Sequence, residues 1–167
     1  MHTRLTWPFC RPQGPLCATA AIACVIGLAS ATPAHADEIP GGPAAAAACS
    51  DFARALDLAA ANYSSFANAL AIGEIDPNYT DPIVRTSNIT GRTALRLAAA
   101  DALSASLTPG LHPEVAAPMR SWSYSSTKLL LLMGMRANVD RINNAATELN
   151  SDAYAARMAC AQTDTPV

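Results

Sequence analysis

Two cysteines are the residues of this sequence whose chemistry is easiest to specify. The chain has five cysteines, and three of them fall within the first 36 residues. If that segment is removed, Cys49 and Cys160 remain, one near each end of what is left. Metal-binding pairs and redox dithiols favour close spacing, whereas one distant pair in an exported protein most simply forms a disulfide. We therefore predict a disulfide between Cys49 and Cys160.

Other residues with catalytic potential are few and poorly placed for catalysis. His112 is the only histidine after residue 36, and it lies between a turn and a proline, which favours a capping role over a catalytic one. The acidic residues Glu74, Asp76 and Asp81 flank prolines, as turn and cap residues do. The sequence has no Cys/His cluster with zinc spacing and no glycine-rich phosphate loop. We therefore predict that the protein is not an enzyme and has no catalytic, cofactor-binding or metal-binding residue.

Carriage of a hydrophobic ligand is an alternative function. Besides the methionines, the iron ligands available for haem are His112 and four tyrosines, Tyr63, Tyr79, Tyr124 and Tyr154. Alanine-rich helix faces can also leave space for a lipid-like molecule. Such a cavity is expected near Trp122, Leu129, Leu130 and Met133. The opposing interpretation is that Tyr63 and Met133 are core residues and that the other tyrosines are partly exposed.

The first 36 residues have the pattern of a secretory signal peptide. Arg4 and Arg11 precede an apolar stretch at 16–29, and Ala34-His35-Ala36 supplies the small residues that signal peptidase requires. The apolar stretch is shorter than the roughly 20 residues that a membrane span needs. We predict cleavage after Ala36 and a secreted, periplasmic or cell-envelope location, with no transmembrane segment afterwards. The expected organisation is 1–36 signal peptide, 37–48 lead-in, 49–162 helical domain and 163–167 tail.

The charge of the remaining chain bears on its partners. Residues 37–167 contain thirteen acidic and nine basic residues, a net charge of −4. Nucleic acids and anionic membranes reward clustered Lys and Arg, so neither is expected as the main partner. We predict a non-catalytic protein that acts through contacts with an envelope or extracellular protein.

Two apolar stripes at helical spacing frame the domain. Their members recur at alternating steps of three and four residues, from Cys49 to Leu70 and from Val139 to Cys160. Between them, Asp81-Pro82 and His112-Pro113 are typical helix starts, and Thr108-Pro109-Gly110 is a stop. No stretch alternates apolar and polar residues as a strand would. The sequence therefore predicts an all-α fold.

The predicted disulfide limits the topology. It places the start of the first helix beside the end of the last helix. Because successive helices run in opposite directions, this requires an even number of antiparallel helical segments. A break near 134–138 gives an antiparallel four-helix bundle closed by one disulfide. We favour this bundle because it buries more apolar surface per residue than an extended hairpin does. The alternative is an extended helical hairpin with one long kinked helix. In either fold we expect the first and last stripes to face each other, with Phe52 roughly level with Ala156 and Leu56 with Ala153.

Several segments resemble those of small exported, Ala-rich helical proteins of mycobacteria and related actinobacteria. They are Ala34-His35-Ala36-Asp37, Cys49-Ser50-Asp51-Phe52, Gly91-Arg92-Thr93-Ala94-Leu95-Arg96 and Met158-Ala159-Cys160. The similarity covers the chain after the signal peptide and rests on the Ala-rich composition together with these short segments. It implies an exported helical domain framed by two cysteines.

Overall fold

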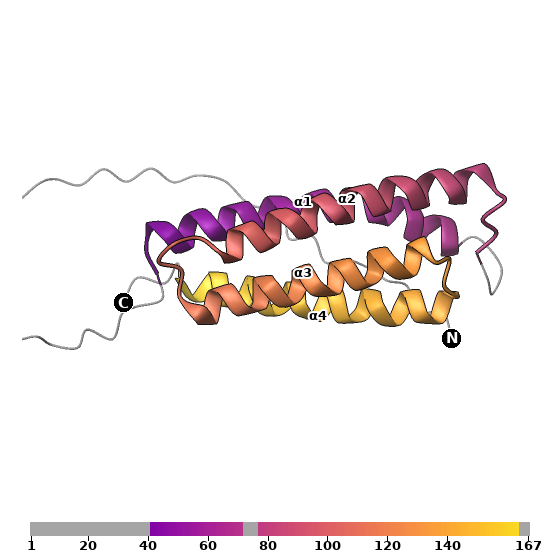
Figure 1. Cartoon of the computed structure of the whole chain (residues 1–167). Coiled ribbons are helices and arrows are strands. Elements are labelled where there is room, and N and C mark those ends of the chain that lie inside the picture. Colours follow the sequence, from indigo (N-terminus) through magenta and orange to yellow (C-terminus); the bar gives the residue numbers. More distant parts are fainter. Residues whose placement is uncertain (1–40, 72–76, 164–167) are drawn as a thin grey trace, which may run out of the picture. The chain divides into compact units, whose positions relative to one another are not determined.

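Four α-helices account for most of the chain that the computed structural model describes, namely residues 41–71 and 77–163 (Figure 1). Those residues contain no strand. The helices are α1 (Pro43–Ala71), α2 (Pro82–Ser106), α3 (Pro113–Gly134) and α4 (Val139–Thr163). They form the predicted antiparallel four-helix bundle. The predicted signal peptide at 1–36, Glu74 and Asp76 lie outside the described residues.

The predicted helix starts are confirmed for α2 and α3. Asp81 caps α2, because its Oδ1 accepts a hydrogen bond of 2.7 Å from the Ile83 N–H and Pro82 is the first helical residue. His112 caps α3 in the same way, since its Nδ1 accepts from the Glu114 N–H at 3.4 Å. α1 begins at Pro43, within the segment 37–48 that was expected to be a lead-in. The alanines that follow are strong helix formers and extend the helix toward the amino terminus.

The break between the last two helices is present. α3 ends at Gly134 and α4 begins at Val139, so the bundle is correct and the extended hairpin is excluded. Pro118 lies inside α3 without ending it. Arg136, between the helices, has a positive φ of 54°. The Arg136 N–H donates to the Met133 carbonyl and the Ala137 N–H to the Leu132 carbonyl, which is the Schellman pattern of helix ends.

The core combines a few large side chains with many alanines. Phe52 of α1 meets Trp122 of α3 edge to face, with ring centroids 5.5 Å apart, and both are buried. Gly91 of α2 lies so close to α1 that an added Cβ would be 3.7 Å from the Asn62 carbonyl oxygen. The buried residues of α2 are mostly small: Asn88, Gly91, Ala94, Ala98, Ala99, Ala102, Ala105 and Ser106. Small residues therefore let α2 approach its neighbours closely.

The way α1 and α4 meet differs from the expectation. α1 packs extensively on α2, α2 on α3, and α3 on α4, whereas α1 and α4 have much less contact with each other. Their stripes are buried but point into the shared core, where Phe52 meets Trp122. The two stripes therefore pack less closely against each other than the other neighbouring helices do. The cause is the small-residue face of α2, which draws α1 toward α2.

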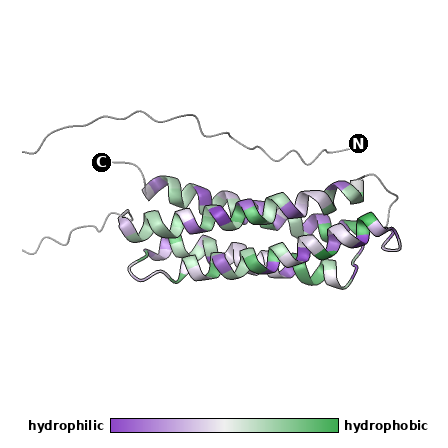
Figure 2. Ribbon diagram, turned by 90° about the horizontal axis from the view of Figure 1, so that it is seen from above, coloured by the Kyte–Doolittle hydropathy of each residue, from purple (hydrophilic) through white to green (hydrophobic). Residues whose placement is uncertain are grey.

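Hydrophobic and hydrophilic residues are interspersed along each helix (Figure 2), as expected for amphipathic helices that bury one face. Within residues 41–71 and 77–163, no helix is both long and apolar enough to cross a membrane.

Candidate functional site

The two predicted disulfide residues meet at one end of the bundle. The Sγ atoms of Cys49 and Cys160 are 2.08 Å apart and their Cα atoms 5.8 Å apart. The bond joins the beginning of α1 to the end of α4, and so closes the bundle as predicted.

An open groove of about 470 Å³ lies beside this disulfide, between α1 and α4. Phe52, Leu56 and both cysteines contribute to its walls, and Asp57 and Arg157 are its charged residues. Since both charged side chains are exposed and of opposite sign, the groove presents no net charge to a ligand.

The remaining chemistry-bearing residues are scattered. His112 caps α3, and Tyr124 and Tyr154 are exposed. Tyr63 is buried in the core, where burial, and to a lesser degree the nearby Tyr79, raises its pKa to about 12. Tyr79 packs under the Arg136 guanidinium, which lies 5.5 Å from the ring centroid. Across the described parts of the chain, no group of three or more His, Cys, Asp or Glu side chains could hold a metal ion.

The residues predicted to surround a ligand cavity do not form one. Trp122, Leu129 and Met133 are at most 2% exposed and are packed in the core. Leu130 is the exception, since it lines a surface groove elsewhere. Trp122, Leu129 and Met133 thus fill the space that the prediction assigned to a ligand, whereas Leu131 in the same run is 58% exposed.

That surface groove lies between α2 and α3 and was not predicted from the sequence. Its volume is about 480 Å³. Apolar and cationic side chains line it together with Thr93 and Gly134: Ile89, Leu130, Leu131, Met135, Arg92 and Arg96. We call it the α2–α3 groove. The spacing of Ile89, Arg92, Thr93 and Arg96 on one helix face was the available signal, but sequence alone does not show that α3 adds apolar neighbours.

Arg92 is held in the α2–α3 groove by its contact with α3. An added Cβ at Gly134 would lie 3.1 Å from Arg92 Nη2 and 3.2 Å from its Cζ, so the guanidinium rests on the bare backbone there. Its Nε is buried and has no hydrogen-bond partner. Gly134 is the last residue of α3, where the helix dipole favours a nearby cation. In the described residues neither Arg92 nor Arg96 forms an ion pair.

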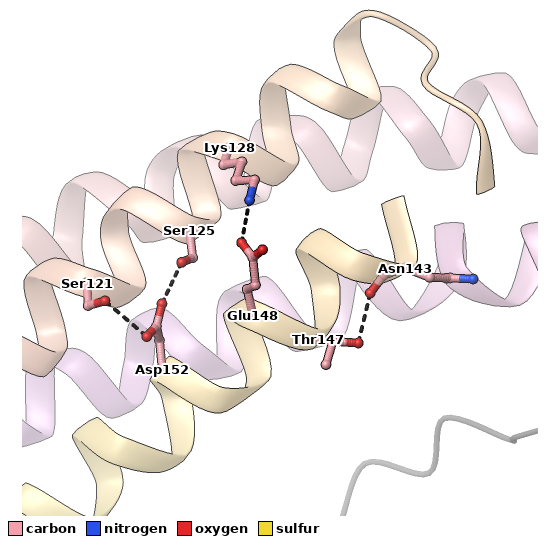
Figure 3. A network of polar contacts seen from close by, with 7 residues as sticks. All are labelled: Ser121, Ser125, Lys128, Asn143, Thr147, Glu148 and Asp152. Carbon is pink, nitrogen blue, oxygen red and sulfur yellow. Dashed lines mark hydrogen bonds and ion pairs between the residues drawn. The ribbon is translucent and has the colours of Figure 1, made fainter. Parts of the chain in front are cut away.

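A polar network on another face links α3 to α4 (Figure 3). Ser121 and Ser125 both donate hydrogen bonds to the Asp152 carboxylate, and Lys128 pairs with Glu148. The Asp152 carboxylate is occupied by two serine hydroxyls, so the network holds the two helices together and offers no free acid–base pair.

One protein family matches most of the chain. The family model described as the Rv2240c four-helix bundle domain matches residues 32–161. The match agrees with the resemblance to helical proteins of the mycobacterial type. Comparison with curated proteins and comparison with solved structures gave no match.

Proposed function

The chain belongs to this family, the Rv2240c four-helix bundle domain family, and on that premise we propose that it is an exported, non-catalytic protein that acts through contacts with another protein. It works in the cell envelope or outside the cell, after cleavage behind Ala36. The signal pattern at 1–36 and the Cys49–Cys160 disulfide support export, because disulfides persist in oxidising compartments.

The distribution of exposed apolar residues carries the proposal of protein contacts. Most of the large apolar side chains that are exposed in the described residues belong to α2, α3 or their last turns: Ile83, Ile89, Leu97, Leu103, Leu107, Tyr124, Leu131 and Met135. α4 adds Tyr154 and Met158, and α1 adds none. Of these, Ile89, Leu131 and Met135 lie together in the α2–α3 groove, and exposed apolar residues gathered beside polar groups are typical of interaction surfaces.

Ligand carriage, the alternative, has weaker support. Its expected cavity residues Trp122, Leu129 and Met133 are packed in the core. The groove beside the disulfide is open on the surface and would leave much of a lipid-like ligand in water, whereas ligand sites bury most of the ligand.

Export is tested by the amino terminus of the protein recovered outside the cytoplasm. We expect the chain to begin at Asp37, measured by intact mass and amino-terminal sequencing. A chain that keeps residues 1–36 contradicts the proposal.

Protein contact is tested by photo-crosslinking in the native cell. A photoreactive amino acid in place of Leu131 should give a reproducible adduct of one size, because Leu131 is 58% exposed and lines the α2–α3 groove. The same amino acid in place of Thr147, which is exposed on α4, is the matched control. Equal adducts from both positions, or none from either, would count against a contact surface on α2 and α3.

Native mass spectrometry of the same material separates the two functions. A carrier retains a lipid or haem mass, whereas a contact protein has the mass of the bare chain or of a protein complex.

A further inference from the structure

We propose that the α2–α3 groove binds an acidic amphipathic helix of the partner protein, with a carboxylate at Arg92 and Arg96 and apolar side chains against Ile89, Leu131 and Met135. This rests on the proposed contact function and specifies the chemistry of the partner.

The charge of the groove is opposite to that of the protein. The chain carries a net charge of −2, yet the side chains that line the α2–α3 groove include two arginines and no acidic residue. Two other cations, Lys128 and Arg54, are paired with acidic residues, Glu148 and Asp51 respectively. An uncompensated positive site of this kind selects an anionic partner.

Arg92 is pre-positioned for that role. The contact with Gly134 restricts its guanidinium, so less side-chain freedom is lost when a partner binds. Its Nε is buried without an acceptor. A partly desolvated cation interacts more strongly with a carboxylate than an exposed one does.

The apolar residues determine the form of the partner. Ile89 is 53% exposed, Leu131 58% and Met135 67%, and they flank the arginines. An amphipathic helix supplies apolar side chains at positions i, i+4 and i+7 together with carboxylates beside that stripe, and such helices dock into grooves between two helices. Methionine at such a surface adapts to the shape of the incoming side chains.

An anionic membrane fits the same arginines less well. A bilayer is approached by a whole face of the protein, and the net negative charge of the chain opposes that approach. The groove, in contrast, offers its positive charge to a narrow ligand. We therefore favour the peptide and treat the membrane as a competing outcome.

The experiment measures binding of two labelled peptides to the mature, disulfide-bonded protein by fluorescence anisotropy. Both peptides are helices of about 15 residues with leucine at i, i+4 and i+7. One carries glutamates beside the leucine stripe, and the other carries lysines at the same positions. We expect the glutamate peptide to bind at least about tenfold more tightly. Equal binding, or preference for the lysine peptide, overturns the proposal.

Variants locate the site. Arg92→Ala should weaken binding of the glutamate peptide about tenfold or more, the range for a hydrogen bond to a charged group. Gly134→Ala should weaken it too, because the new methyl displaces the Arg92 guanidinium while keeping both charges. Arg141→Ala removes an exposed cation from α4 and should leave binding unchanged. Equal losses for Arg92→Ala and Arg141→Ala would show a non-specific charge effect and overturn the proposal.

Vesicles of phosphatidylglycerol distinguish the membrane. If they bind in an Arg92-dependent manner and the glutamate peptide does not, the groove is a lipid site and the proposal fails. The Leu131 crosslink keeps this result separate from the proposed function. Adducts at Leu131 without acidic-peptide binding refute only the partner chemistry, whereas absence of both refutes protein contact as well.

Discussion

At the scale of single residues, Tyr63 shows how burial controls ionisation. Its side chain is 3% exposed in the core, and its pKa is raised to about 12 because the phenolate would lose its hydration there. The folded protein therefore holds the Tyr63 proton more firmly than the unfolded chain, whose tyrosines titrate near pH 10.

Tyr63 should make stability fall in strongly alkaline solution. The pKa of Tyr63 is higher in the folded protein than in the unfolded chain. Tyr63 therefore contributes fully to the free energy of unfolding below pH 10, and this contribution is lost as the pH rises from 10.0 to about 12. The loss is roughly 2–3 kcal/mol in the free energy of unfolding across that window. Urea unfolding at several pH values should show a clearly shallower slope in Tyr63→Phe than in the wild type, with the remaining slope due to Tyr79, whose pKa burial also raises. The matched control, Tyr124→Phe at an exposed position, should keep the wild-type slope. Identical slopes in all three proteins would mean that Tyr63 ionises freely.

Gly91 shows how one residue governs the contact of two helices. An added Cβ there would lie 3.2 Å from the Met133 methyl and 3.8 Å from Phe66 Cβ. Alanine adds a methyl that the flexible end of Met133 can accommodate, whereas a larger side chain must push α1 away from α2.

Gly91→Leu should destabilise the protein by about 1–3 kcal/mol through overpacking. Ala100→Leu places the same side chain on the exposed face of α2 and should change the free energy of unfolding by less than about 0.5 kcal/mol. Thermal and urea unfolding measure both. If the two variants were equally stable, the close approach of α2 to α1 at Gly91 would be disproved.

At the scale of secondary-structure elements, the end of α3 departs from the usual choice of residue. The left-handed position that follows a Schellman helix end is commonly glycine, but here it is Arg136, with φ of 54°. Arg136 also stacks on Tyr79. The backbone conformation costs about 1–2 kcal/mol for a residue with a Cβ, and the cation–π contact returns about 0.5–1 kcal/mol.

Two substitutions at Arg136 separate these effects. Arg136→Ala loses the contact with Tyr79 and keeps the unfavourable backbone, so it should be less stable than the wild type. Arg136→Gly loses the same contact but relieves the backbone, and should be more stable than Arg136→Ala by about 1 kcal/mol. Differential scanning calorimetry on both variants gives the comparison. An alanine variant as stable as the glycine variant would contradict the left-handed conformation.

The elements were predictable to different degrees. Local signals such as Asp81-Pro82 and His112-Pro113 determined where α2 and α3 begin, because capping depends on neighbours in sequence. The pairing of helices was not predictable, since the stripe of α1 fits α2 and α4 equally well as a pattern. Gly91 and the alanines of α2 decide that choice through distances that no periodicity contains. The α2–α3 groove was missed for the same reason, because Ile89, Arg92 and Met135 become neighbours only after the helices pack.

At the scale of the whole molecule, the disulfide joins the pair of neighbouring helices with the least contact. α1 and α4 have little contact with each other, and Cys49–Cys160 links them at one end. Only 5% of the chain is aromatic and its core is rich in alanine, so burial stabilises each residue modestly. The crosslink should therefore supply a large share of the stability.

Replacing both cysteines, Cys49→Ser with Cys160→Ser, should lower the free energy of unfolding by about 4–5 kcal/mol on the chain-entropy account of a long loop. The bond spans a sequence separation of 111 residues. Urea unfolding of the variant and of the reduced wild type should agree, which controls for effects of the serines. Unchanged midpoints after reduction would mean that the bundle does not depend on the bond.

The same bond has a consequence for cleavage by proteases. Because it ties the first helix to the last, a cut in the exposed turn at Pro109 and Gly110 divides the backbone into two halves that stay covalently tethered. Each half also keeps its packing partners, α1 with α2 and α3 with α4. A singly nicked molecule should therefore migrate at full length on a non-reducing gel and separate into fragments only with a reductant. After the proposed export the protein would meet extracellular proteases, and it would survive a first cut as a two-piece assembly.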